Sequence, residues 1–591
     1  MNLIMKQSLW YKGYCMLHNL ENWYHMKRIM KYKVLWILAV LLITATSCED
    51  FLDRPTEDSF TIDNFYQTDD QCFQAANILY NSPWYDFQRG FLWIGDQLAG
   101  NVYTGTETVY QNFNLNSTNE DLVNASNSLW LVNGHCNAVI ENVRSKAGSD
   151  VSKDVKNTVI GEAMTMKALA YFYLARIWGA VPIIHSNTEI IGAGTANQLR
   201  KNRLEDVYEY IQRTLLRAIE LLPEENKAGR IHKYSAMGLL SKVYLTRSGL
   251  GQSGTRDQQY LDLAKQYAKQ VIDNYPGQLE PVYSNLFRIS TGNYNPENLI
   301  SWRWTISNTW TSQNSIQSDV ALNNFTGIAG DTWGSWRGVT IDLQNLFGEN
   351  ALSATRQNDD TRRKATMMMW GDHYEYFWRH EGGFTVTMDN DNNVAGSTFG
   401  VPTGANIVKH IVGHYEGDHA AENGNLGQRM ATDLATHILR LADVYLIYAE
   451  AILGNSEKTT DAEALKYFNA VRQRAIPGAA AVEELDFEMI FNERRKELAL
   501  EGDNWYDYVR LSYYDPDKAI SMINAQERGS YEGDLYGYYK GEVDESDMSV
   551  NSFKVSIFKM DFTLPFPEID MSMNPWLSEG AVPFDFETIE Y

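Results

Sequence analysis

The chain has 591 residues, with 75 Asp and Glu against 51 Lys and Arg, which gives a formal net charge of −24 at pH 7. This length is ample for a large buried core. So acidic a chain excludes nucleic acid and anionic lipid head groups as expected partners, because both repel negative charge. Aromatic residues make up 13% of the chain, with 16 Trp and 35 Tyr. Part of this excess must fill the core, but a sugar-stacking surface also needs aromatic rings.

The first feature in chain order is a predicted export signal. Basic residues within Lys27–Lys33 precede an apolar run, Val34–Ile43, and small residues then lead to Cys48. Ten apolar residues are about half of the ~20 that span a bilayer. The small residues resemble the recognition box of bacterial lipoprotein signal peptidase, with Ala45 where Leu is usual. We therefore predict removal of residues 1–47 and lipidation of Cys48; the alternative is a plain secretory signal with an incidental Cys.

Two features of the N-terminal region stay open at this point. The first 25 residues do not resemble an export signal, so three methionines are candidate translation starts: Met1, Met26 and Met30. After lipidation of Cys48, the remaining cysteines Cys72 and Cys136 are either two buried thiols or a disulfide formed in an oxidising compartment.

Apolar residues at helical spacing recur along the chain and predict paired helices. The segments are 159–177, 204–222, 239–244, 260–275, 438–449 and 464–471. Three pairs match the tetratricopeptide (TPR) pattern, in which the first helix carries Leu, a small residue and Tyr, and Pro ends the second. The first helices contain Leu169-Ala170-Tyr173, Leu240-Ser241-Tyr244 and Leu441-Ala442-Tyr445. We predict a mainly α fold built on a TPR-like scaffold of helical hairpins.

Between about residues 277 and 436 the helical spacing fades, while Gly, Asn, Trp and Thr become frequent. The alternation in Phe384–Met388 is typical of a short strand. We predict a loop-rich, partly β insertion carried by the helices, and a similar irregular stretch over 515–560. The expected divisions are a signal segment, an N-terminal helical region, a ligand-binding insertion and a C-terminal helical region: 1–47, 48–276, 277–436 and 437–591.

Several motifs, in order, resemble the SusD/RagB-like lipoproteins of Bacteroidetes glycan-uptake systems. They are CEDFLD (48–53), AMTMKALAYFYLARIWGAVPII (163–184), GRIHKYSAMGLLSKVYL (229–245), ILRLADVYLIYAEAIL (438–453), YFNAVRQRA (467–475), ERRKELALEGDNWYDYVR (493–510) and LPFPEIDMSMNP (564–575). Two small departures are Asp503-Asn504, where the family usually has a basic pair, and Asp570–Met573, which lengthens the closing motif.

This resemblance implies a SusD-like α-α superhelix and a surface-exposed lipoprotein of the outer membrane. Glu49-Asp50, directly after Cys48, resembles the signal that directs such lipoproteins to the cell surface. The implied function is non-catalytic binding of oligosaccharide or polysaccharide and its delivery to a SusC-like TonB-dependent transporter. The implied partners are therefore the glycan, the transporter and the outer membrane, and no cofactor is implied.

Most charged and aromatic residues in these motifs have a structural interpretation. Four are spaced for pairing along one helix: Glu493, Arg494, Arg495 and Glu497. We expect Glu450 to pair with Arg472 or Arg474, and Trp505 and Tyr508 to lie in the core.

The sequence contains no nucleophile elbow, HExxH pair or phosphate-binding loop. His410, His414 and His419 could bind a metal ion if this segment were helical, but two intervening glycines disfavour a helix there. Residues 389–393 begin like a calcium loop but lack the required Gly and Glu, so we expect a surface turn, with a structural calcium left open. We predict no enzyme activity, no cofactor and no metal site.

Sugar binding needs flat aromatic faces for C–H groups beside amides, arginines or carboxylates for hydroxyls. Two regions have this composition, one from Trp84-Tyr85 to Tyr103 and one from Trp302 to Arg337. The second lies in the insertion, where loops on a rigid frame commonly carry recognition residues. The candidate ligand-binding residues are Trp84, Arg89, Trp93, Asp96, Asn101, Trp310, Asn314, Trp333 and Trp336. Alternatives are a peptide or other nutrient as cargo, a structural TPR adaptor, and a hydrolase on the same scaffold.

Overall fold

Long helices dominate the N-terminal region of this computed structural model, which describes residues 65–307, 309–353, 358–387 and 400–591. Residues 66–591 form one compact unit. The predicted signal segment, Cys48 with the acidic pair after it, and the 389–393 turn lie outside the described residues.

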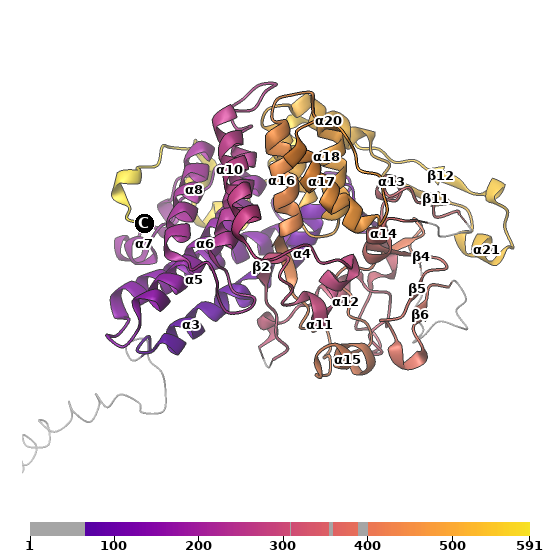
Figure 1. Ribbon diagram of the computed structural model, residues 1–591, viewed down its shortest axis with the longest axis horizontal. Helices are drawn as coiled ribbons and strands as arrows, with labels where there is room; N and C mark the ends of the chain where they lie inside the picture. Colours follow the sequence, from indigo (N-terminus) through magenta and orange to yellow (C-terminus); the bar gives the residue numbers. More distant parts are fainter. Residues whose placement is uncertain (1–64, 308, 354–357, 388–399) are drawn as a thin grey trace, which may run out of the picture. The chain divides into compact units, whose positions relative to one another are not determined.

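The N-terminal helices lie side by side in a stack (Figure 1, indigo to magenta). Its members are α3 (Asp69–Asn77), α5 (Glu120–Lys146), α6 (Lys153–Trp178), α8 (Leu204–Leu221), α9 (Lys233–Arg247) and α10 (Gln258–Asn274). From α5 onward, each helix packs against the next. Pro223 and Pro276 follow the ends of α8 and α10, as predicted. The sequence pattern missed α5, because its buried face includes polar Asn133 and Asn137.

The stack continues across the insertion, because α10 packs against α16 (Leu441–Leu453) although the two are far apart in sequence. Helix α16 pairs with α17 (Ala462–Ala475). Small side chains at Ala442, Ala449 and Ala464 let these helices pack closely around Leu446 and Phe468. The three predicted helix pairs, α6 with α8, α9 with α10 and α16 with α17, and with them the mainly α TPR-like scaffold, are confirmed.

The insertion is closed at its base by strands. Strand β2 (Asn298–Trp302) pairs antiparallel with β8 (Thr436–Arg440), so the chain leaves and rejoins the helical stack at one place. Ile438 therefore lies on a strand, and its assignment to the following helix is wrong: the apolar pattern ran through the β8–α16 junction without a break. A four-stranded sheet, ordered β1-β3-β7-β4, comprises β1 (Val102–Thr104), β3 (Arg337–Val339), β7 (Ala405–Ile407) and β4 (Met367–Met369).

Short elements complete the N-terminal region and the insertion. The helices are α4 (Phe87–Leu92), α7 (Asn187–Ala193), α11 (Ile289–Gly292), α12 (Ile316–Val320), α13 (Ile341–Leu346), α14 (Thr361–Thr366) and α15 (Ala420–Asn423). Strands β5 (His373–Tyr374) and β6 (Phe384–Thr385) pair with each other, in the region where alternation predicted a strand. In the C-terminal region, a further pair of strands joins β9 (Lys458–Thr459) to β10 (Leu485–Asp486). The insertion is partly β, as predicted, and its exact boundaries stay a prediction.

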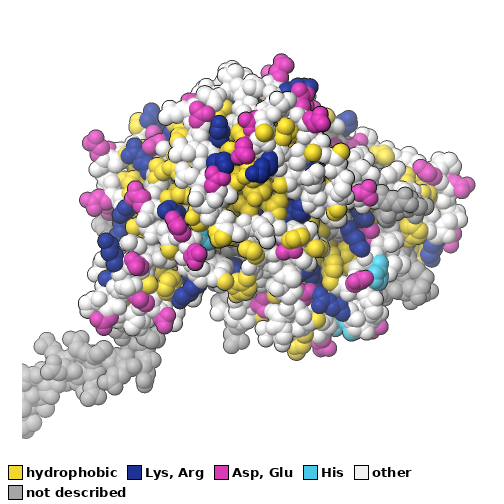
Figure 2. Space-filling model, in the orientation of Figure 1, with side chains coloured by type: hydrophobic (Ala, Val, Ile, Leu, Met, Phe, Trp, Pro, Cys, Tyr) yellow, Lys and Arg dark blue, Asp and Glu magenta, His cyan; other side chains and the backbone are white. Residues whose placement is uncertain are grey.

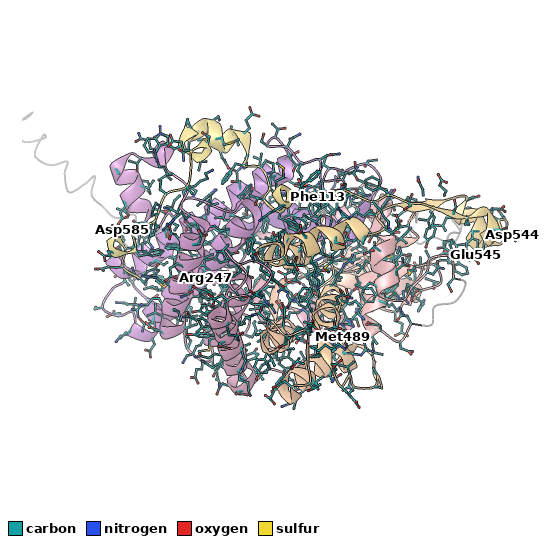
Figure 3. All side chains as sticks on the ribbon, turned by 90° about the horizontal axis from the view of Figure 1, so that it is seen from above. Phe113, Arg247, Met489, Asp544, Glu545 and Asp585 are labelled. Atoms are coloured by element: carbon teal, nitrogen blue, oxygen red, sulfur yellow. The ribbon has the colours of Figure 1, made fainter. Side chains whose placement is uncertain are left out.

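The C-terminal region adds helices against the stack and one projecting segment. The helices are α18 (Phe487–Glu497), α19 (Asn504–Ser512), α20 (Pro516–Ala525), α21 (Leu535–Lys540) and α22 (Glu568–Met573). Strands β11 (Ser530–Glu532) and β12 (Ser549–Asn551) pair on either side of α21, and Figure 3 shows Asp544 and Glu545 at the far end of this segment. The predicted irregularity over 515–560 is wrong at α20, which Asp515 caps and Pro516 begins.

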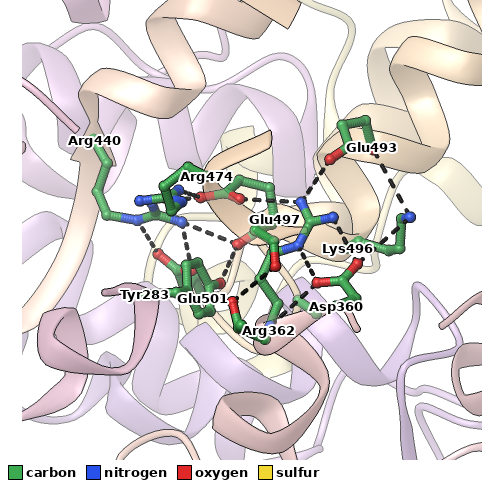
Figure 4. Close-up of polar contacts among 12 residues, drawn as sticks. Tyr283, Asp360, Arg362, Arg440, Arg474, Glu493, Lys496, Glu497 and Glu501 are labelled. Carbon is green, nitrogen blue, oxygen red and sulfur yellow. Dashed lines mark hydrogen bonds and ion pairs between the residues drawn. The ribbon is translucent and has the colours of Figure 1, made fainter. Parts of the chain in front are cut away.

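Buried ion pairs tie α18 to the rest of the molecule (Figure 4). Glu497 is fully buried and accepts from Arg440 at 2.8 Å, Arg474 at 2.5 Å and Arg362 at 3.2 Å. These arginines come from β8, α17 and α14. The prediction of pairing mainly along α18 is wrong, because its charged face is buried against other elements and not exposed to solvent, where neighbouring turns would pair. Arg494 likewise contacts Asp443 at 2.7 Å.

Glu450 illustrates the same correction. It pairs with Arg510 at 2.5 Å and Arg256 at 2.8 Å, and not with Arg472 or Arg474 as predicted, because Arg474 already contacts Glu497. Sequence proximity suggested the wrong partners: Arg256 precedes α10, and Arg510 lies on α19.

Other expectations concern the core and the surface. Trp505 and Tyr508 are buried, as predicted. Cys72 and Cys136 are both free and buried, which decides between the two alternatives in favour of thiols. Within the described residues, no helix has both the length and the apolar character that crossing a bilayer requires. Figure 2 shows acidic and basic side chains interspersed over the face in view, so the net negative charge is not gathered there into one patch.

Candidate ligand-binding site

The two predicted aromatic regions meet at Asp319, which lies on α12. Its Oδ1 accepts from Arg89 at 2.6 Å, from Arg337 at 2.7 Å and from the indole Nε1 of Trp333 at 3.0 Å. Arg89 comes from α4 and Arg337 begins β3, so this one carboxylate joins three elements. We call Asp319, Arg89 and Arg337 the Asp319 cluster.

Two acidic side chains complete the charge balance of the Asp319 cluster. Arg89 also donates to Asp121 at 2.8 Å, and Arg337 donates to Glu107 at 2.6 Å. Burial opposes the charge on Arg89, but Asp319 and Asp121 outweigh it and raise the pKa of its guanidinium. The cluster is therefore a fixed arrangement of charged donors and acceptors, of which Arg89 is more than a third exposed.

Aromatic rings surround the Asp319 cluster. The guanidinium of Arg337 lies 4.4 Å from the ring centre of Trp336 and 4.9 Å from that of Trp93. Arg89 lies 5.9 Å from the Trp93 ring. Trp333 and Trp336 are half-buried, whereas Trp93 is only 2% exposed. Its buried ring packs against the guanidinium groups of both arginines.

Trp310 is the most exposed ring of the group, at 50%. It begins a short 3₁₀ turn, Trp310–Ser312, and its ring centre lies 6.4 Å from that of Tyr85 in an edge-on arrangement. Burial raises the pKa of the Tyr85 phenol. We call Tyr85, Trp310, Trp333 and Trp336 the aromatic face. These rings offer apolar surface beside fixed charged groups, as carbohydrate binding requires.

Five of the nine predicted binding residues are buried in the interior, where their neighbours are other parts of the protein: Trp84, Trp93, Asp96, Asn101 and Asn314. Trp84 stacks on Trp302, with ring centres 4.9 Å apart, and its indole donates to the carbonyl oxygen of Leu79. The Asn314 amide donates to the carbonyl oxygen of Leu434. A Trp-rich and Asn-rich segment serves the core here as well as the surface.

Asp96 and Asn101 form hydrogen bonds between the N-terminal region and the 493–510 motif of the C-terminal region. Asp96 accepts from the backbone N–H groups of Leu500 and Gly502, at 2.8 and 2.7 Å, and from the Asn101 amide at 2.8 Å. Burial raises the pKa of Asp96 to about 6. Asn101 accepts in turn from Arg495 at 2.9 Å. These contacts hold the turn before α19, a structural role.

The sequence prediction lacked the carboxylates of the site: Glu107, Asp121 and Asp319. A signal existed, because Arg89 and Arg337 each lie among aromatic residues, and an arginine that is partly or wholly buried needs a counter-charge. The chain has 75 acidic residues, however, so spacing alone could not select the partners.

The three histidines considered as metal ligands have separate partners. His410 contacts the carbonyl oxygen of Leu500 at 2.6 Å, His414 accepts from the backbone of Gly417, and His419 contacts the carbonyl oxygen of Asn425. Among the described residues, no three acidic, His or Cys side chains form a group suited to a metal ion.

Comparison with known proteins shows the family to which this fold belongs. Residues 267–581 match the model of the SusD family, and residues 50–245 match a model described as starch-binding and associating with the outer membrane. The chain belongs to the SusD family.

Individual relatives agree with this assignment. A SusD-like protein of Bacteroides ovatus is 34% identical over 579 residues, which covers 95% of this chain and all of that protein. A protein whose crystal structure contains a xylogluco-oligosaccharide is 33% identical in sequence to this chain. The two structures match with a TM-score of 0.75 over 87% of this chain and 99% of the other. The surface glycan-binding protein A of Bacteroides thetaiotaomicron, in complex with laminarihexaose, shares the fold at 19% identity and a TM-score of 0.61, over 86% of this chain and 98% of that one.

Proposed function

We propose that this protein binds a neutral glycan at the aromatic face without cleaving it. The observation that carries the proposal is the Asp319 cluster, which holds Trp333 by a hydrogen bond and Trp336 against Arg337, beside the exposed Trp310. Sugar rings would stack on the indoles, and their hydroxyls would pair with Arg89 and the carboxylates.

The relative solved with a xylogluco-oligosaccharide supports an oligosaccharide of that type as the first ligand to test. Within the described residues, the hydrogen bonds from Arg89, Arg337 and Trp333 to the Asp319 carboxylate all go to Oδ1. Oδ2 is therefore available to accept from a ligand hydroxyl. Delivery of the bound glycan to a SusC-like TonB-dependent transporter, with the protein held on the cell surface by a lipid on Cys48, completes the proposed role. The outer-membrane description of the matching family model supports this location.

The test is calorimetric titration of the soluble protein with xyloglucan and laminarin oligosaccharides and with peptides. Replacing Trp310, Trp333 and Trp336 together by Ala is expected to weaken glycan binding at least a hundredfold, because each stacked ring contributes about 1 kcal/mol or more. The matched control is Trp576→Ala, a 38% exposed Trp that stacks on Arg200 outside the site.

Unchanged binding by the triple variant, with a native thermal transition, would contradict the site. Peptide binding in place of glycan binding would support the other cargo. Release of reducing sugar by the purified protein, lost on changing one carboxylate, would show a hydrolase instead.

A further inference from the structure

A cavity of about 650 Å³ opens between the loop before α9 and the insertion. Its lining includes Asn81, Tyr294, Arg303, Thr305 and Asp433. A second cavity of about 310 Å³ adjoins it, and Tyr294 and Arg303 line both. Cavities of about 300–1,000 Å³ are the size that holds small organic ligands. No ring of the aromatic face lines either cavity among the described residues, so this space is separate from the site above.

Within the described segments, Arg303 is a cation without a counter-ion. Its guanidinium lies 3.8 Å from the ring centre of Tyr294 and donates to the carbonyl oxygen of Asn293. In the part of the chain that the structure describes, it has no carboxylate within ion-pair distance, whereas Arg230 in the same cavity wall pairs with the buried Glu162 at 2.5 Å. Arg303 lines the cavity and therefore has N–H donors left for a ligand. Arg230 uses N–H donors on Glu162.

Asp433 is the corresponding anion. Its carboxylate accepts from the Ile306 backbone at 2.5 Å and from the Asn423 amide at 2.7 Å. The nearest ring nitrogen, Nε2 of His419 at 4.0 Å, accepts from the Asp433 backbone, while Nδ1 lies 3.0 Å from the Asn425 carbonyl oxygen. Nε2 of His419 thus accepts from the Asp433 backbone N–H and does not donate a hydrogen bond to the carboxylate.

The charges of the cavity indicate the class of ligand. Arg303 supplies donors and Asp433 supplies acceptors, yet the two do not pair with each other. An anionic ligand would be repelled by Asp433 and a cationic one by Arg303. A neutral polyhydroxylated ligand satisfies both, because a hydroxyl both donates and accepts. The Tyr294 ring, 67% exposed, adds an apolar face for sugar C–H groups.

Two short chain segments connect the cavity with the aromatic face. Asn81 lines the cavity four residues before Tyr85, and Thr305 lines it five residues before Trp310. Even fully extended, five residues span at most about 18 Å. The Thr305 N–H donates to the carbonyl oxygen of Ser312 at 2.8 Å, which ties the two ends of this segment together. One ligand chain can therefore contact both places.

We propose that this cavity is a second saccharide subsite, which binds a further stretch or a branch of the same neutral glycan that lies on the aromatic face. The proposal rests on the proposed function and deepens it. It assigns ligand contact to Tyr294, Arg303 and Asp433, and it makes affinity dependent on glycan length or branching. A glycan that covers only the aromatic face gains nothing from the cavity.

The test compares short and long oligosaccharides of one neutral glycan by calorimetry. The first variant, Tyr294→Ala with Arg303→Gln, removes the ring and the donor fork. The second, Ala228→Trp, fills the cavity from its exposed rim without removing any polar group. Both are expected to weaken binding of the long oligosaccharide about tenfold and to leave binding of the shortest bound one within about twofold. The control is Ile191→Ala, a 78% exposed residue on α7 that lines neither cavity.

The outcomes separate this inference from the proposed function. Equal affinity of long and short glycans for both cavity variants and the wild-type protein would overturn the subsite while leaving the aromatic face intact. Loss of short and long ligands alike, with an unchanged thermal transition, would also overturn it, because the cavity would then be part of one indivisible site. No binding of any glycan by the wild-type protein would instead refute the proposed function, and the subsite with it.

Discussion

Arginine–carboxylate clusters occur in two regions of this molecule, and the comparison shows what burial decides. Around Glu497 the side chains are almost wholly excluded from solvent. Each arginine there forms an ion pair with Glu497 from another element of the fold. Around Asp319 the geometry is similar, with one carboxylate accepting from two arginines, but Arg89 is 38% exposed. The first cluster joins the helical stack to the C-terminal helices. The second has the same chemistry at the surface, where we propose that a ligand takes part in it.

The largest expected effect comes from breaking the buried cluster. Glu497→Gln leaves Arg440, Arg474 and Arg362 short of a buried counter-charge, and the free energy of unfolding is expected to fall by about 3–5 kcal/mol. Urea unfolding measures this change. The control is Glu484→Gln, whose exposed pair with Lys458 is expected to contribute little. A loss as small as that of the control would show that the buried pairs add no net stability.

The same cluster predicts how stability depends on pH. Burial alone would raise the pKa of Glu501, but Arg440 and Lys409 outweigh it and lower the pKa from 4.5 to about 2. The unfolded chain therefore binds more protons in acid, so the stabilisation is complete above about pH 5 and is lost as the pH falls towards 2. The expected loss is about 3 kcal/mol for this group.

Urea unfolding at pH 7, 5, 4 and 3 tests this dependence. Glu501→Gln is expected to be less stable at pH 7 and to have a flatter curve between pH 5 and 3, because the titrating group is gone. An equally steep loss in this variant would assign the acid sensitivity to other carboxylates, such as Glu422, whose pKa is also lowered to about 2.

At the surface cluster the effect is expected on binding more than on folding. Asp319→Asn removes the charge that Arg89 and Arg337 share, and glycan affinity is expected to fall roughly tenfold to a hundredfold, as for hydrogen bonds to charged groups. The unfolding free energy is expected to fall less than in Glu497→Gln. The control is Asp544→Asn, at the far end of the projecting segment in Figure 3. A stability loss as large as that of Glu497→Gln, with unchanged affinity, would make Asp319 a second structural hub.

The sequence predicted the scaffold well because helix pairing follows local spacing. The periodic apolar residues and the prolines after α8 and α10 are each visible within about 20 residues. The site was predicted only in part, because it depends on contacts between residues more than 200 positions apart, such as Arg89 with Asp319. Trp93 and Trp310 look alike in sequence, yet one supports two arginines in the interior and the other is half exposed. Composition identified the region; only the fold separates its surface from its core.

The smallest expected effect distinguishes charge from geometry within the surface cluster. Arg89→Lys keeps the positive charge beside Asp319, but one ammonium cannot reproduce the planar fork that reaches Asp319 and Asp121 together. Glycan affinity is expected to fall about fivefold, as for the loss of one hydrogen bond, with little change in the unfolding free energy. Arg213→Lys, in an exposed pair with Glu209 on α8, is the matched control. If Arg89→Lys binds as tightly as the wild-type protein, charge alone suffices at this position. The planar fork would then matter only in the buried cluster, where each guanidinium must satisfy several acceptors at once.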